Sequence, residues 1–127
     1  MESISNIKNK NEIIKSIHNL DCIKKGNFTL KSGIQSNYYV NLRNLISQPL
    51  VLKKICELIY QKLPTNEEFY ICGLPYAGIP YATGVSLLYD IPLLILRKET
   101  KKYGMQNLID GLDNKRNISK VIIIDDI

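Results

Sequence analysis

The heptapeptide VIIIDDI, residues 121–127, decides the fold class of this 127-residue chain. Its four consecutive aliphatic residues are typical of a strand that is buried on both faces. Two similar apolar runs precede it, FYICG at 69–73 and LLIL at 93–96, and a helical pattern over 79–89 separates those two. The sequence therefore predicts an α/β domain with a parallel sheet flanked by helices.

The first half of the chain has a different pattern. Isoleucines and leucines recur at helical spacing in the first twenty residues, so we expect an amphipathic helix there. FTLKSG at 28–33 and QSNYYVNLR at 35–43 then predict a β-hairpin, with one of the rings of Tyr38 and Tyr39 in the core and the other exposed. Ser47 is expected to cap a second helix, with Pro49 in its first turn.

Composition narrows the class of protein. The length allows one domain, and no apolar run is long enough to cross a membrane. Cys22, Cys56 and Cys72 lack metal or redox spacing and are expected to be reduced, buried thiols of a cytoplasmic protein. The net charge of +5 is densest in RKETKKYG, residues 97–104, a short segment after a strand, which favours a small anionic ligand over nucleic acid.

Three candidate ligand-binding segments follow the three predicted strands. They are the turn GLPYAG at 73–78, the pair Arg97–Lys98 and the pair Asp125–Asp126. Ligands of open parallel sheets bind beyond the carboxyl ends of the strands, so we expect these segments to converge. Taken alone, the acid pair is either a plain strand terminus or a binder of sugar hydroxyls or Mg²⁺, and the turn is either an ordinary connection or an anion site. No G-x-x-x-x-G-K-[ST] string is present, which argues against a P-loop nucleotidase.

Four segments together resemble one family. FTLKSGIQSNYYVNLR, CGLPYAGIPYATG, IPLLILRKETKKYGMQNLIDG and VIIIDDI are similar, in order and spacing, to the orotate phosphoribosyltransferases, and most similar to the form that makes up the N-terminal half of eukaryotic UMP synthase. The resemblance implies a type I phosphoribosyltransferase fold over residues 1–127. An N-terminal helix and hairpin hood would cover about 1–48, and the core would cover about 49–127.

The resemblance also implies an activity. These enzymes transfer the phosphoribosyl group of 5-phosphoribosyl 1-diphosphate (PRPP) to orotate in UMP biosynthesis, giving orotidine 5′-monophosphate and pyrophosphate. They require Mg²⁺, which would be carried mainly by PRPP or pyrophosphate rather than by direct protein ligands. They are cytoplasmic homodimers, and the loop at 98–111 would be shared across subunits.

The resemblance assigns roles to individual residues. Orotate would contact Lys31, Tyr38 and Tyr39. PRPP would contact Lys31, Tyr76, Ala77, Arg97, Lys98, Lys101, Tyr103, Asp125 and Asp126, and the chemistry would fall to Lys101, Asp125 and Asp126. Ala77 stands where bacterial members have lysine, so its contact would be through the backbone only. Tyr103 stands where bacterial members have histidine.

One departure from the family lies at the end of the sequence. The family continues past the two acids with a Thr/Ser/Gly-rich loop that binds the 5-phosphate, and this loop is absent here. The resemblance therefore predicts a fragment or a truncated relative, and predicts that the 127-residue chain alone does not turn over PRPP. Two alternatives stay open. They are a purine-type phosphoribosyltransferase, against which FTLKSG and the tyrosine pair argue, and a non-catalytic module of the same fold, against which the loop cations argue.

Overall fold

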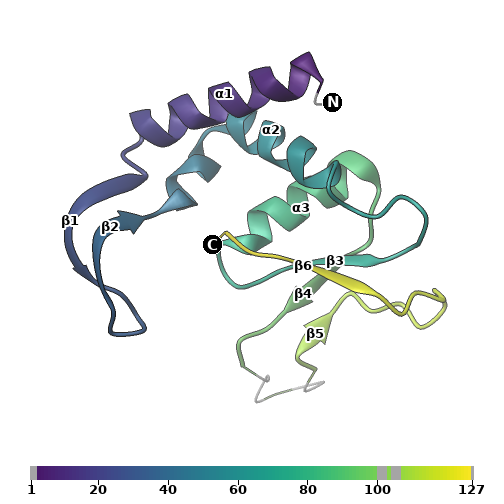
Figure 1. The fold of residues 1–127 in the computed structure, drawn as a ribbon. Helices are drawn as coiled ribbons and strands as arrows, with labels where there is room; N and C mark the ends of the chain where they lie inside the picture. Colours follow the sequence, from purple (N-terminus) through teal and green to yellow (C-terminus); the bar gives the residue numbers. More distant parts are fainter. Residues whose placement is uncertain (1–2, 100–102, 104–106, 127) are drawn as a thin grey trace. The chain divides into compact units, whose positions relative to one another are not determined.

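The computed structural model describes residues 3–99, 103 and 107–126 (Figure 1). The chain forms two compact units, Met1–Ile55 and Cys56–Ile127, and each has its own packing. None of the helices in the described part of the chain has the length and apolar composition needed to span a membrane.

The first unit combines a helix with a hairpin. Helix α1, Ile4–Asn19, begins at Ser3, whose side chain accepts a hydrogen bond from the Asn6 N–H. Strands β1, Ile23–Thr29, and β2, Gln35–Val40, pair antiparallel, as predicted. The unit packs around the buried side chains of Cys22, Leu45 and Val51, which contact Ile13, Ile17, Leu20, Leu42 and Ile55.

Two local expectations for this unit are wrong. Ser47 does not cap a helix, because it ends a 3-10 helix, η1 (Leu42–Ser47), and its hydroxyl donates to the Asn44 carbonyl. Helix α2, Pro49–Tyr60, instead begins at Pro49, whose fixed φ and missing N–H suit the first helical position. Neither tyrosine is in a core, since Tyr38 is 52% and Tyr39 41% exposed.

The second unit is the α/β part of the chain. Its sheet has the order β5-β4-β3-β6, in which β3 (Tyr70–Gly73), β4 (Leu93–Leu96) and β6 (Val121–Ile124) are parallel. Helix α3, Gly78–Tyr89, lies along one face of these strands (Figure 1). The predicted fold class is thus confirmed. A short strand, β5 (Ile109–Asp110), pairs antiparallel with β4 and was not predicted, because two residues carry no periodic signal.

Cys56 of α2 packs against α3 at Gly84, which has no side chain. The Cys56 thiol donates to the Tyr81 carbonyl over 3.6 Å, and a β-carbon on Gly84 would lie 2.5 Å from the Cys56 sulfur. Burial raises the pKa of Cys56 from 9.0 to about 11. Cys22, Cys56 and Cys72 are all free and buried, as the sequence predicts.

Candidate functional site

The turn after β3 packs directly on the end of β6. The Leu74 N–H donates to the Ile124 carbonyl over 2.8 Å, and the Gly78 N–H closes the turn by donating to Leu74. A β-carbon on Gly78 would lie 2.2 Å from the Ile124 oxygen and 3.3 Å from Asp125 Cα. Glycine at this position therefore lets the turn touch the strand end at which the acid pair begins.

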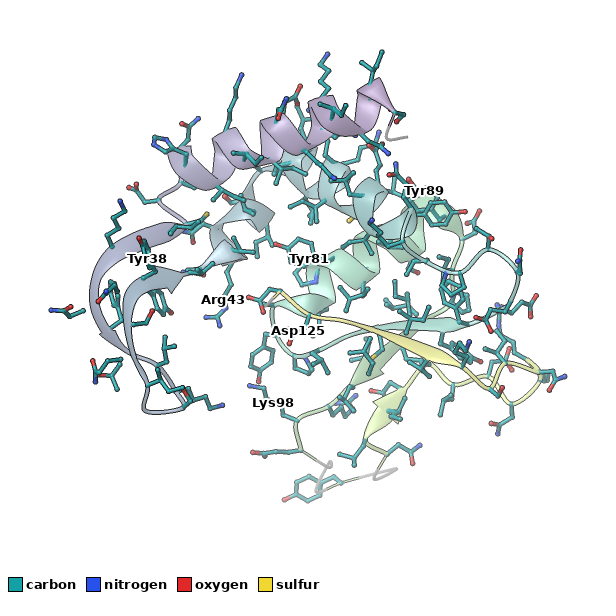
Figure 2. The ribbon with its side chains drawn as sticks, viewed as in Figure 1. Tyr38, Arg43, Tyr81, Tyr89, Lys98 and Asp125 are labelled. Atoms are coloured by element: carbon teal, nitrogen blue, oxygen red, sulfur yellow. The ribbon has the colours of Figure 1, made fainter. Side chains whose placement is uncertain are left out.

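The same turn also meets the segment after β4. The Lys98 ammonium lies 4.1 Å from the centroid of the Tyr76 ring, which is a cation–π contact. The peptide bond between Pro75 and Tyr76 is cis, and the Tyr76 side chain is 72% exposed. The turn thus contacts both the cation after β4 and the strand end before the acids, and Figure 2 shows Lys98 and Asp125 at this edge of the sheet.

Arg97 is held from two sides. Its backbone N–H donates to the Leu108 carbonyl over 2.8 Å, which extends the pairing of β4 with β5. Its guanidinium Nη2 forms an ion pair with a carboxylate oxygen of Asp110 on β5. The Nε atom of Arg97 is buried and has no hydrogen-bond partner among the described residues.

Asp110 is the residue of this site that sequence reasoning missed. It is the first acid after the cation-rich segment 97–104, and that contrast is the available signal. Without the antiparallel strand β5, however, nothing in the sequence places Asp110 beside Arg97 rather than beside a lysine of the same run.

A pocket of about 460 Å³ lies at this end of the sheet. It is lined by Pro75, Tyr76, Ile79, Ile95, Leu96, Arg97, Lys98 and Glu99. The lining joins aliphatic side chains of α3 and β4 to two cations and one aromatic ring. Such a surface suits an anionic ligand, because the single carboxylate, Glu99, offsets only part of the positive charge of Arg97 and Lys98.

The acid pair lies at the end of β6. The Asp126 N–H donates to the Asp125 carboxylate over 2.9 Å, and the Asp125 side chain is exposed. Both carboxylates offer oxygen atoms that can ligate Mg²⁺ or accept hydrogen bonds from ribose hydroxyls. Among residues 3–99, 103 and 107–126, no three His, Cys, Asp or Glu side chains lie close enough together to hold a metal ion.

The sheet register confirms the predicted convergence. Gly73 at the end of β3 is paired with Ile95 on one side and with Ile124 on the other, so the turn, the cations and the acids all follow the same edge. Ala77 lies in the turn, immediately before α3.

The other predicted site residues are exposed or lie outside the described residues. Lys31, Tyr38 and Tyr39 are exposed and belong to the first unit. Tyr103 is 85% exposed, and Lys101 lies outside the described residues. The roles expected of these residues remain predictions.

A glycine turn, a cation pair and an acid pair lie along one edge of a mostly parallel sheet, and this α/β fold is that of the phosphoribosyltransferase class. The chain is 38% identical over 129 residues to orotate phosphoribosyltransferase of Methanococcus maripaludis, which covers 100% of the chain and 69% of that protein. The chain belongs to the orotate phosphoribosyltransferase family. It is also 38% identical over 112 residues to uridine 5′-monophosphate synthase of Bos taurus, over 87% of the chain and 23% of that protein.

A solved structure carries the same fold. UMP synthase of Leishmania donovani superposes with a TM-score of 0.74 and 34% identity, over 91% of this chain and 24% of that one. The chain therefore spans about two thirds of the archaeal relative and about a quarter of the synthases. No protein-family model matches the sequence.

Proposed function

We propose that this domain transfers the phosphoribosyl group of PRPP to N1 of orotate, giving orotidine 5′-monophosphate and pyrophosphate. One observation carries the proposal. The turn at 73–78 contacts Lys98 through Tyr76 and the start of the acid pair through Gly78, in a member of the orotate phosphoribosyltransferase family. The side chains that bind the diphosphate of PRPP would thus lie beside those that bind its ribose.

The leaving group explains the cations. Breaking the bond from C1 of ribose to pyrophosphate leaves negative charge on the diphosphate, and Arg97 and Lys98 would stabilise that charge, together with Lys101. A contact of this kind typically contributes about 10² to 10³ in rate. Bound Mg²⁺ would neutralise part of the charge on the diphosphate, held mainly by the oxygens of PRPP, since Mg²⁺ usually takes one or two carboxylates plus substrate phosphates.

The acid pair would bind the ribose of PRPP, and the hairpin residues would bind orotate. Asp125 and Asp126 would bind the ribose hydroxyls and counter the positive charge that develops on the sugar. Lys31, Tyr38 and Tyr39 would line the orotate site. Orotate deprotonated at N1 is already a nucleophile, so the protein needs no strong base at this step.

Two further expectations come from the family. We propose that the enzyme is a cytoplasmic homodimer in which residues 98–107, the part of the expected 98–111 loop that precedes Leu108 and strand β5, close over the neighbouring subunit's site. Tyr103 would lie on that loop, and the Ala77 backbone would lie near the diphosphate. Closure of a loop over the site would exclude water, which otherwise hydrolyses PRPP.

An assay of orotidine 5′-monophosphate formation tests the activity. It compares the 127-residue chain with a fusion that adds the remaining C-terminal residues of the M. maripaludis relative, both with Mg²⁺, PRPP and orotate. We expect product from the fusion, and product from the chain alone would contradict the prediction that it is inactive. A fusion that folds but forms no product, and a chain that binds neither orotate nor pyrophosphate, would overturn the proposed function.

The same fusion separates the alternatives. Hypoxanthine bound in preference to orotate would indicate a purine enzyme, and binding of orotate and PRPP without turnover would indicate a non-catalytic module. Lys101→Ala should lower the chemical rate far more than the affinity for PRPP, because charge on the leaving group grows in the transition state.

A further inference from the structure

We infer that Asp110 is a positioning residue, which holds the Arg97 guanidinium in place for the diphosphate. The inference rests on the proposed function for the identity of the ligand, but the ion pair on which it depends is a property of the protein alone. No role for Asp110 follows from the strand-end argument, because Asp110 lies on the antiparallel strand β5.

The backbone fixes both partners of the pair. Asp110 is opposite Ile95 in the register of β4 and β5, and the hydrogen bond from Arg97 to Leu108 continues that ladder past the end of β4. Both Cα positions are therefore set by sheet hydrogen bonds, so the ion pair forms without any further ordering of the backbone. What remains flexible is the arginine side chain, which has the rotamer freedom of a long chain.

The pairing leaves most of the guanidinium's donors for a ligand. A guanidinium carries five N–H donors in a planar fork, and Asp110 is paired with one nitrogen, Nη2. The buried Nε atom shows that the inner edge of the group is enclosed, which further restricts rotation. Arg97 also lines the pocket with Lys98, so the guanidinium is held beside the space where a diphosphate would bind.

A single carboxylate also has an electrostatic cost. Asp110 repels an incoming anion, so it weakens binding unless the orientation of Arg97 that it secures contributes more. The two effects act through different routes. Repulsion is independent of Arg97, whereas positioning requires it. A double-mutant cycle between the two residues separates them.

The first experiment measures binding of inorganic pyrophosphate with Mg²⁺ to the 127-residue chain by calorimetry. We expect Asp110→Ala to weaken binding about three- to tenfold when Arg97 is present. In an Arg97→Gln background the same change should have no effect or should tighten binding. Asp113→Ala is the matched control, because Asp113 also pairs with an arginine, Arg116, and is comparably exposed at 49% against 40% for Asp110. It should leave the affinity within about twofold of the wild type.

Equal effects of Asp110→Ala in both backgrounds, or tighter binding with Arg97 present, would overturn the inference. The second experiment needs no ligand: the Arg97 Nε–H signal is followed by NMR in folded wild-type and Asp110→Ala chains. Its exchange with solvent should accelerate on loss of Asp110 and not on loss of Asp113. An unchanged signal would refute positioning even if pyrophosphate bound. Conversely, failure of the wild-type chain to bind pyrophosphate, with the Asp110 effect on the signal intact, would count against the proposed function and not against the ion pair.

Discussion

A β-carbon on Gly78 would lie 2.2 Å from the carbonyl oxygen of Ile124, so the first residue of α3 and the last residue of β6 are in backbone contact. The same Ile124 oxygen accepts the Leu74 N–H. The two ends of the turn are thus fastened to one peptide group, immediately before Asp125. Any change that separates them displaces the acid pair from the turn.

Gly78→Ala should therefore be severe. The clashing atom is a backbone oxygen in a sheet and cannot rotate away, so we expect a loss of at least about 3 kcal/mol in the free energy of unfolding, or no folded protein. Urea unfolding followed by circular dichroism measures it. Leu87→Ala on the same helix, at a side chain that is 78% exposed, is the control and should cost less than about 1 kcal/mol. Similar losses in the two variants would contradict the contact.

A second steric pair gives a rescue experiment. Gly84→Ala would place a methyl group 2.5 Å from the Cys56 sulfur, and overpacking of this kind typically costs about 1 to 3 kcal/mol. The higher helix propensity of alanine relative to glycine offsets about 1 kcal/mol of this loss. In a Cys56→Ala background the sulfur is gone and the nearest remaining Cys56 atom is 3.8 Å away. Gly84→Ala should then be neutral or stabilising, and an unrelieved loss would refute the contact between sulfur and helix.

Cys56 also predicts a dependence of stability on pH. Because burial raises its pKa from 9.0 to about 11, the unfolded chain releases this proton first, and the stability present below pH 9 is lost as the pH rises toward 11. The full loss is about 2 to 3 kcal/mol. Desolvation raises the pKa of Tyr89 as well, so the wild-type curve contains both groups. The difference between wild type and Cys56→Ala isolates the thiol. If the two unfolding free energies fall in parallel between pH 8 and 11, the thiol does not have this pKa.

The stack of Lys98 on Tyr76 should contribute to anion binding. An exposed cation–π contact is worth about 0.5 to 1 kcal/mol, so Tyr76→Leu should weaken pyrophosphate binding about two- to fivefold by releasing the Lys98 ammonium. Tyr76→Phe keeps the ring and should bind as the wild type does. A loss with phenylalanine would mean that the hydroxyl, not the ring, matters. In a Lys98→Met background the leucine change should add nothing.

The sequence was sufficient for the parallel part of the sheet. Four-residue aliphatic runs at 93–96 and 121–124 coincide with β4 and β6. The expectation that these strands are buried on both faces is wrong, since Ile95, Val121 and Ile123 are 46%, 43% and 54% exposed. The placement of Lys98, Tyr76 and Asp125 at one edge followed from the rule for parallel strands. Asp110 could not be found in this way, because its position depends on the long-range pairing of a two-residue strand. The prediction that Ser47 caps a helix was wrong because its hydroxyl donates to the Asn44 carbonyl within the 3-10 helix η1.

The hydrogen bond between Arg97 and Leu108 makes the segment 98–107 a tether with both ends on the sheet edge. Eleven peptide steps separate the two anchors, so at about 3.5 Å a step the chain path is about 38 Å, out and back. The Cα atom of any residue of the segment must therefore lie within about 19 Å of that edge. If Lys101 or Tyr103 serves a neighbouring subunit, that subunit's reaction centre must lie within this radius plus the length of the side chain, which limits how two copies of the domain can be arranged.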